Sequence, residues 1–175
     1  DSEKGAWYEK YMNFALDEDF FGGYRDDKGE LTGKIGPGDS LTRFQAIKVM
    51  YALSTRLDMG IGARGCDPAT VTQTTATAWM GDHWARGYVQ CIENSDVELT
   101  LLKDVIKDDL ANGEQSTLRW EAMVTGFEML QLQAADVKTE AFADLKESKL
   151  NTTFQAMIEK AGQLEVISGY PDGTF

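Results

Sequence analysis

The sequence has few of the residues that build metal or catalytic centres. Among 175 residues there are one histidine, His83, and two cysteines, Cys66 and Cys91. A histidine-based metal site or a Ser-His-Asp triad therefore has a single candidate, and no nucleophile motif stands near it. Acidic residues are abundant, but no pair stands out as the two carboxylates of a glycoside hydrolase. We therefore expect no enzyme, no metal and no cofactor.

Basic residues and long apolar runs are also scarce. Lys and Arg number 17 against 29 Asp and Glu, which gives a formal net charge of −12 at pH 7. Nucleic-acid binding depends on cations that neutralise phosphates, so we expect no nucleic-acid partner. No apolar run approaches the roughly 20 residues that a membrane span needs, and Asp1 opens a polar stretch rather than a signal peptide. The composition fits a soluble surface protein.

The two cysteines leave two states open. Cys66 and Cys91 can form a disulfide if the compartment is oxidising and stay as thiols if it is not. Because two cysteines prove little by themselves, our expectation is two free thiols.

What the chain does contain is an internal repeat. Three stretches, Trp7–Ala15, Trp84–Ile92 and Phe154–Ala161, begin with an aromatic residue and carry apolar residues at i, i+4 and i+7. This spacing is one face of an α-helix. The aligned positions are Trp7, Tyr11, Phe14 and Ala15, then Trp84, Tyr88, Cys91 and Ile92, then Phe154, Ile158 and Ala161. Each stretch therefore predicts an amphipathic helix.

An arginine follows the first two stretches at a matched distance. Arg43 and Arg119 lie 36 and 35 residues after their opening tryptophans. The stretches that follow, Phe44–Tyr51 and Trp120–Phe127, align without a gap and each predicts a second helix. Four residues before these helices are candidate N-caps: Asp39, Ser40, Ser116 and Thr117.

Glycine turns separate the helices of each pair. Phe21–Gly29 in the first segment matches Ile167–Phe175 in the third, with a slip of one residue. Pro171-Asp172-Gly173 is a turn signature, because proline presets φ and glycine accepts a positive φ. The repeated unit is thus a helix, a glycine turn, a loop and a second helix.

These motifs resemble those of the S-layer homology (SLH) family. Ile167–Phe175 is similar to the family's inter-helix signature almost letter for letter. Leu41–Ala46 resembles the hallmark Ile-Thr-Arg-Ala-Glu-Ala, and Leu118–Ala122 is a poorer copy. Asp82–Ala85 resembles the opening of a repeat, and Phe142–Leu145 resembles its lead-in. The order and spacing of the motifs extend the resemblance over nearly the whole chain.

The resemblance implies a mainly α fold of three pseudo-repeated helix-loop-helix units. In the family, the first helices form a central bundle of a pseudo-threefold spindle, and the second helices form prongs. On this basis we expect a first repeat at 1–58, a linker or insertion at 59–80, a divergent second repeat at 81–135, and the N-terminal half of a third at 136–175.

The resemblance also implies a binding site. Family grooves between prongs bind a cell-wall carbohydrate, often a pyruvylated polymer, and the hallmark arginine is a main contact. A guanidinium beside free N–H groups at a helix start suits a carboxylate-bearing sugar. Carried over to this chain, the predicted carbohydrate-binding residues are Arg43, Arg119, Trp7, Trp84, Asp82, Thr42, Gln45 and Glu121.

The sequence departs from the family in several places. Phe44 and Trp120 stand where a small alanine is usual, Gln45 replaces a glutamate, and Leu118 replaces a threonine. The second segment has the acidic stretch Glu93–Asp109 in place of the glycine turn, and the third reaches Phe175 before any hallmark arginine. We therefore expect one or two altered grooves and an incomplete third unit.

Two further stretches fall outside the repeat. Met59–Ala78 contains Gly60, Gly62, Gly65 and Pro68, which break a helix, so it predicts a linker whose Thr70–Thr77 portion is strand or disordered. Val97–Leu110 predicts an extra short helix only loosely.

Plainer interpretations stay open for most of these residues. Trp7 and Trp84 are candidates for sugar stacking but equally for core anchors at helix starts. Arg43 and Arg119 can bind an anionic sugar or pair with local acids. Asp26, Asp27 and Glu30 lack the full calcium-loop pattern, so solvated turn acids are the better interpretation.

The resulting hypothesis is a non-catalytic cell-surface module that binds a cell-wall polysaccharide or peptidoglycan-linked polymer and tethers an S-layer or envelope protein. The alternative is an assembly module that has lost sugar binding and works by self-association or with another chain that completes the third repeat. A charge of −12 repels an anionic polymer. Either the arginines create a local positive groove, or the partner is neutral or cationic.

Overall fold

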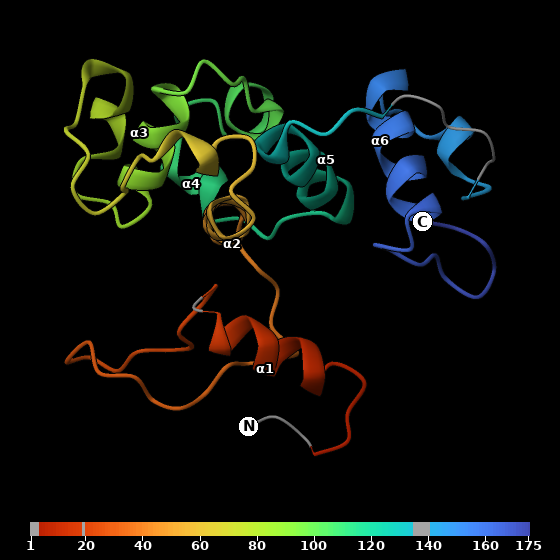
Figure 1. The fold of residues 1–175 in the computed structure, drawn as a ribbon, viewed down its shortest axis with the longest axis horizontal. Helices are drawn as coiled ribbons and strands as arrows, with labels where there is room; N and C mark the ends of the chain where they lie inside the picture. The colour runs from red at the N-terminus through yellow and green to blue at the C-terminus, as the bar shows by residue number, and fades with distance from the viewer. Residues whose placement is uncertain (1–3, 19, 135–140) are drawn as a thin grey trace.

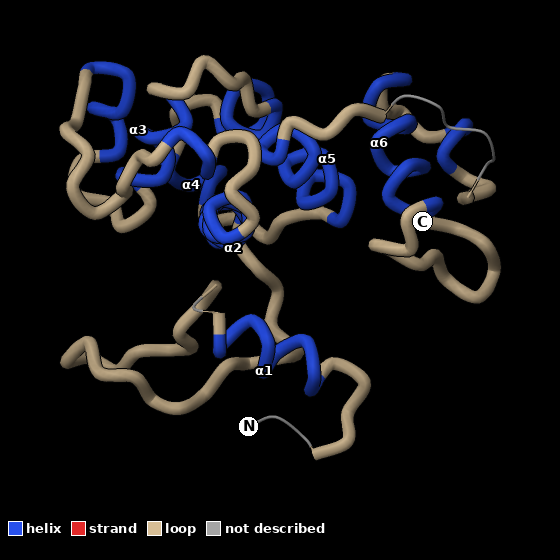
Figure 2. Tube along the Cα trace, viewed as in Figure 1, coloured by secondary structure: helices blue, strands red, loops and turns tan. Residues whose placement is uncertain are grey.

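The computed structural model describes residues 4–18, 20–134 and 141–175. Within these ranges the protein is mainly α-helical and has no β-strand (Figures 1 and 2). The α-helices are α1 (Glu9–Asp17), α2 (Arg43–Arg56), α3 (Arg86–Glu93), α4 (Leu110–Gly113), α5 (Arg119–Leu130) and α6 (Thr152–Gln163). None of the described helices combines the length and apolarity that crossing a membrane requires.

The helices fall where the repeated pattern predicts them. Helices α1, α3 and α6 overlap the three aromatic-led stretches, and α2 and α5 begin at Arg43 and Arg119. Between α3 and α4, Leu101–Ile106 forms one short π-helix, η3, so the extra helix expected in this stretch is confirmed in part.

The predicted N-caps are wrong by one to three residues. The cap of α2 is Thr42, whose hydroxyl accepts the N–H of Gln45, while the Gln45 side chain accepts the N–H of Thr42. Before α5, the Glu121 carboxylate accepts the N–H of Leu118 at 2.9 Å. Both helices start late because the residues in front of them are used in a contact between the two helix starts.

This contact places α2 and α5 side by side. Thr42 and Ser116 form an isolated antiparallel bridge. The N–H of Arg43 donates to the Gln115 carbonyl at 3.0 Å, and the N–H of Thr117 donates to the Leu41 carbonyl at 2.8 Å. Because backbone groups at a helix start lack helical partners, each hallmark segment satisfies some of the other's.

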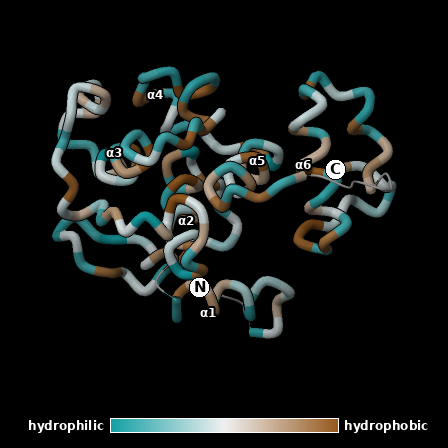
Figure 3. Tube along the Cα trace, turned by 45° about the horizontal axis from the view of Figure 1, so that its top comes forward, coloured by the Kyte–Doolittle hydropathy of each residue, from teal (hydrophilic) through white to brown (hydrophobic). Residues whose placement is uncertain are grey.

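Two hydrophobic clusters hold the helices together. The larger one joins α2, α3 and η3 and includes Phe44, Ile47, Tyr51, Ile61, Met80, Val89, Ile92, Leu99, Ile106 and Met129. The smaller one lies beside α6, away from α3 (Figures 1 and 3), and consists of Phe142, Leu145 and Ile158 with Trp120 packed against them.

The bulky hallmark residues fill these clusters. Phe44 is fully buried, and a methyl group added at Gly113 would lie 2.0 Å from its ring. Trp120 stacks on Phe154 of α6 with ring centroids 5.9 Å apart. Bulky aromatic residues at these two positions therefore have a packing reason, because an alanine would leave a hole at either position.

The stretch expected to be a linker is packed against the core. Cys66 and Cys91 form a disulfide, so the expectation of two free thiols is wrong. The bond ties the 59–80 stretch to α3, and Tyr51 donates its hydroxyl to the Cys66 carbonyl at 2.7 Å. Ile61 is fully buried, and Thr75–Met80 forms a 3₁₀-helix, η2, rather than a strand or a disordered segment.

Helix α1 lies apart from the other helices (Figure 1). None of its residues is buried, and an ion pair between Glu18 and Arg56 joins its end to the end of α2. Trp7, directly before α1, is 81% exposed, so the core-anchor interpretation of this residue is wrong.

Candidate functional site

A groove of about 550 Å³ lies between the first turn-and-loop segment and the start of α2. The glycine turn and the loop after it form its loop wall, one half-buried face of α2 forms its helix wall, and Trp84 also lines it. The lining residues are Phe21, Gly22, Gly23, Tyr24, Arg25, Ile35, Gly36, Asp39, Ser40, Leu41, Gln45, Lys48, Val49 and Trp84.

The loop wall is held by hydrogen bonds around Tyr24. Its N–H donates to the Lys34 carbonyl at 2.8 Å, and its carbonyl accepts the N–H of Thr32 at 2.8 Å. Gly23 has φ +77, and a Cβ there would lie 2.6 Å from the Lys34 oxygen, so only glycine allows this turn. The Tyr24 hydroxyl donates to the Asp39 carboxylate, and this hydrogen bond raises the pKa of Tyr24.

The helix wall presents Gln45, Lys48 and Val49 to the groove. These positions are spaced i, i+3 and i+4, so they share one face of α2. Trp84 stands opposite with 47% of its surface exposed, and its ring is edge-on to buried Phe44, with 6.4 Å between centroids. The contact with Phe44 holds the Trp84 ring in place, while part of the ring stays exposed to solvent.

The groove concentrates positive charge in an acidic protein. Arg25 donates one N–H to the Gly29 carbonyl at 2.6 Å. Neither Arg25 nor Lys48 forms an ion pair with any carboxylate in the described ranges. Two cations and an exposed indole ring in one hollow can bind an anionic, ring-shaped ligand.

Arg43, the first hallmark arginine, does not reach this groove. Its guanidinium makes a bidentate ion pair with Glu121, with Nε and one terminal nitrogen donating at 3.0 and 2.9 Å. The other terminal nitrogen donates to the Asn112 carbonyl at 3.0 Å and to the Gln115 side chain at 3.2 Å. The two side chains are 11% and 2% exposed. This pair joins the two hallmark segments, and sugar binding by Arg43 stays a prediction.

Arg119 occupies the matching position at the start of α5 but has different partners. One terminal nitrogen donates to the Ser168 carbonyl at 3.0 Å. The guanidinium carbon lies 5.0 Å from the ring centroid of Tyr170 and 4.7 Å from that of Phe175. Arg119 therefore holds the third glycine loop against α5 through cation–π contacts, which are worth about 0.5–2 kcal/mol each.

The other predicted site residues are distributed over the molecule. Gln45 and Trp84 lie together in the groove. Thr42 and Glu121 support the helix starts, as described above. Asp82 pairs with Arg86 at 3.2 Å on the surface, and Trp7 does not line the groove.

Sequence reasoning missed Arg25, Lys48, Tyr24 and Asp39 as groove residues. Tyr24-Arg25 follows the repeated glycine turn, where the third unit has Tyr170-Pro171, so a charged residue at the turn was a usable signal. Lys48 lies one turn beyond Gln45 on the same helix face. The hydrogen bond between Tyr24 and Asp39 joins residues 15 positions apart, and no repeat or helical spacing in the sequence predicts it.

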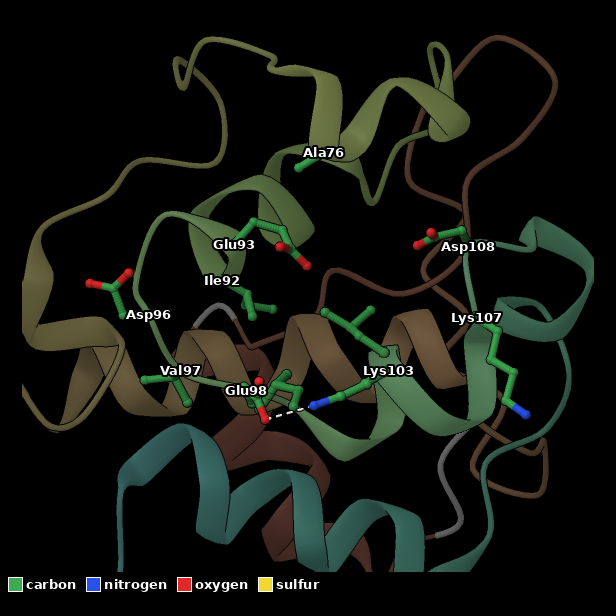
Figure 4. A pocket seen from close by; sticks show the side chains of 11 residues that line it. Ala76, Ile92, Glu93, Asp96, Val97, Glu98, Lys103, Lys107 and Asp108 are labelled. Atoms are coloured by element: carbon green, nitrogen blue, oxygen red, sulfur yellow. Dashed lines mark hydrogen bonds and ion pairs between the residues drawn. The ribbon is translucent and has the colours of Figure 1, made fainter.

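A second hollow, of about 670 Å³, lies between the end of α3 and η3 (Figure 4). The carboxylates of Glu93 and Asp108 point into it from opposite sides, while Lys103 is bound to Glu98 at 2.9 Å. Partial burial, and then the charge of Asp108, raise the pKa of Glu93. These carboxylates repel an anionic polymer, so the groove beside Trp84 is the better candidate.

The structure thus describes a mainly α-helical protein with a groove whose two cations, Arg25 and Lys48, form no ion pair among the described residues. No protein-family model matches the chain, and neither the curated proteins nor the solved structures contain a match. The argument for function therefore depends on the residues themselves.

Proposed function

We propose that this chain is a non-catalytic cell-surface anchoring module that binds an anionic cell-wall glycopolymer and tethers an S-layer or envelope protein. The observation that carries the proposal is the groove at the start of α2, where Arg25 and Lys48 lie beside the exposed ring of Trp84. A pyranose ring stacks on the indole, and its carboxylate or phosphate accepts hydrogen bonds from the two cations.

A net charge of −12 repels an anionic polymer, so we place the binding in one local groove rather than on a broad charged face. Ionic screening limits repulsion from distant carboxylates to about 8 Å at physiological salt. Among the residues that line the groove, the acidic side chain is that of Asp39, which accepts a hydrogen bond from the Tyr24 hydroxyl. The lining therefore carries two cations against one carboxylate.

We further propose that the helices form SLH-like repeated units in a pseudo-threefold order. This is supported by the repeated contact between a second helix and the first helix of the next unit, α2 with α3 and α5 with α6. It is also supported by a turn geometry that recurs: the N–H of Asp26 donates to the Glu30 carbonyl at 2.9 Å, and the N–H of Tyr170 donates to the Thr174 carbonyl at 2.7 Å, each across four residues.

Co-sedimentation with purified, peptidoglycan-linked wall polysaccharide tests the proposal. We expect Trp84→Ala, Arg25→Ala and Lys48→Ala each to weaken binding about tenfold or more. A hydrogen bond to a charged group contributes about 1.5–3 kcal/mol, and stacking adds to it. Arg64→Ala is the matched control, because Arg64 is an exposed arginine outside the groove.

Unchanged sedimentation of the three groove variants would refute a site beside Trp84. Loss of binding in Arg64→Ala as well would mean that attraction is non-specific. Each variant is compared with the wild type by urea unfolding, so that loss of binding is separated from loss of fold.

The second candidate function is a protein assembly module. It is favoured by one specific observation, the exposed aromatic side chains of Trp7, in the turn before α1, and of Tyr11 and Phe14 on α1. Sedimentation equilibrium over a concentration series tests it, and a strict monomer that still binds the polymer would count against self-association.

A further inference from the structure

The single histidine of the chain lies beside Trp84, the tryptophan of the groove. The centroid of the His83 ring is 4.9 Å from that of the Phe44 ring and 5.5 Å from that of the Trp84 ring. Phe44 is fully buried, whereas 16% of the His83 side chain and 47% of Trp84 are exposed. The three rings therefore form one cluster that extends from the core to the groove, and His83 contacts both of the other rings.

The two ring nitrogens of His83 have different partners. Nδ1 accepts the N–H of Ala85 at 3.3 Å, and Nε2 lies 2.8 Å from a carboxylate oxygen of Glu114. A backbone N–H is only a donor, so Nδ1 carries no proton, and Nε2 carries the proton that it donates to Glu114. These hydrogen bonds therefore select the neutral imidazole.

The charged groups around His83 leave Glu114 as the one that it contacts. The 3₁₀-helix η2, which precedes the histidine turn, contains no charged residue. Lys48, one turn after Phe44 on α2, lines the groove. The other charged groups on the surrounding elements have partners of their own: Asp82 with Arg86, Arg43 with Glu121, and Asp109 with the N–H of Ala111.

A second proton on His83 conflicts with this arrangement. The proton enters at Nδ1, where it faces the N–H of Ala85, so two donors meet. Ala85 is fully buried, and its N–H then loses its acceptor in a place closed to solvent. Glu114 attracts the charged ring, but 43% of its side chain is exposed, so solvent weakens this attraction. The charged ring therefore leaves Ala85, and the turn that contains Trp84 opens.

We propose that His83 is a pH-sensitive positioning residue for Trp84. Neutral His83 closes the turn to Ala85 and holds the Trp84 ring against Phe44, where it lines the groove. Protonation opens the turn and separates the two aromatic rings. Histidine side chains change charge between about pH 5 and pH 8, so the switch operates in this interval. The placement of Trp84 needs no ligand, and its consequence for polymer binding rests on the function proposed above.

NMR of the free chain at about pH 7.5 and about pH 5 tests the placement. We expect nuclear Overhauser effects between the Trp84 and Phe44 rings near neutral pH and their loss in acid. Trp84→Phe assigns the indole signals. A change of charge alone does not remove these effects, because they report distance. The contact of Tyr51 with Tyr88, at 5.7 Å between centroids, should persist at both pH values and shows that the fold is intact.

His83→Asn is the matched variant that does not titrate. The side-chain oxygen of asparagine accepts the N–H two residues further on, as Nδ1 of His83 does for Ala85. We expect this variant to keep the ring contact and its co-sedimentation with wall polysaccharide at both pH values. The wild type should bind about tenfold more weakly in acid, as Trp84→Ala does near neutral pH. Glu93 and Glu128, whose pKa values are raised, and the acids of the polymer titrate in both chains, so the comparison removes their effects.

Ring contacts that persist in the wild type in acid would overturn the inference, and this comparison needs no variant. Equal acid loss in His83→Asn would also overturn it, because the loss would then come from another group. If neither chain binds the polysaccharide near neutral pH while the ring contacts respond as expected, the proposed polymer binding is wrong and the positioning of Trp84 by His83 stands.

Discussion

Several residues that the sequence pattern predicts to contact a sugar have structural partners within the protein. The hallmark arginines are the clearest case, because Arg43 joins Glu121 and Arg119 holds the loop that contains Tyr170. Their positions in the repeat are equivalent, but their partners differ because the segments facing them differ. Arg25 and Lys48, in contrast, form no ion pair with a carboxylate among the described residues.

The buried ion pair predicts a large loss on truncation. Replacing Arg43 with Ala leaves the Glu121 carboxylate buried without its partner, which costs about 3–5 kcal/mol of unfolding free energy. The exposed pair of Arg56 and Glu18 is the comparison, and Arg56→Ala should cost far less unfolding free energy, because solvent screens an exposed ion pair. Urea unfolding measures both, and equal effects of the two variants would contradict a structural role for Arg43.

Glu128 predicts a dependence of stability on pH. Burial raises the pKa of this carboxyl, although hydrogen bonds from the Thr100 N–H and hydroxyl act in the opposite direction. A carboxyl whose pKa is higher in the folded than in the unfolded state binds more protons when folded, so stability falls as pH rises between the two pKa values. The loss therefore begins near the ordinary value of 4.5 and is complete above the folded-state pKa.

Glu128→Gln tests this sign, because glutamine does not ionise. We expect the wild type to lose stability relative to the variant between pH 4 and pH 7, measured as the difference in urea midpoint. The opposite trend would mean that the hydrogen bonds from Thr100 outweigh burial and that the charged form is favoured in the folded state.

At the scale of elements, the 59–80 stretch has little regular secondary structure and is held in place by a disulfide and by buried side chains. It contains two short 3₁₀-helices, Gly62–Arg64 and Thr75–Met80, and is held by buried Ile61 and Met80. The Cys66–Cys91 disulfide fixes it to α3. A glycine-rich stretch thereby becomes one wall of the main hydrophobic cluster.

Removal of this disulfide should lower stability strongly. The bond spans 25 residues, and constraining a loop of that length in the unfolded chain is worth about 3–4 kcal/mol in the chain-entropy description. We expect the Cys66→Ala and Cys91→Ala double variant to show this loss in urea unfolding. Dithiothreitol should destabilise the wild type to a similar extent and leave the double variant unchanged; insensitivity of the wild type would contradict a bond in solution.

At the scale of the whole molecule, the helices differ in how firmly they are attached. α2 and α5 form the centre, with the bridge at Thr42 and Ser116 and the pair of Arg43 and Glu121 between them. α1 buries no residue of its own and joins α2 through one exposed ion pair. Local opening should therefore be cheapest at α1.

Amide hydrogen exchange tests this order. We expect the amides of Met12–Asp17 to exchange with little protection, while those in the middle of α2 and α5 exchange only through opening close to global unfolding. Equal protection of α1 and α2 in the free protein would contradict the loose attachment of α1.

The sequence alone determined the helices and their order. The i, i+4, i+7 pattern and the hallmark arginines located α1, α2, α3, α5 and α6. This was possible because the apolar residues of an amphipathic helix recur at the helical period along the sequence. The same pattern placed Gln45 and Trp84 among the candidate residues. These features are local, since each depends on residues within two or three turns of one another.

Only the tertiary structure decided which side chains are bonded or buried within the protein and which stay exposed. Bonding of Cys66 to Cys91 and of Arg43 to Glu121 joins residues 25 and 78 positions apart, which no local pattern encodes. Burial depends on which helix covers which face, so Trp84 lies against Phe44 whereas Trp7, with the same spacing, stays exposed. That difference in long-range packing separates Trp84, held against the core, from Trp7, which is exposed.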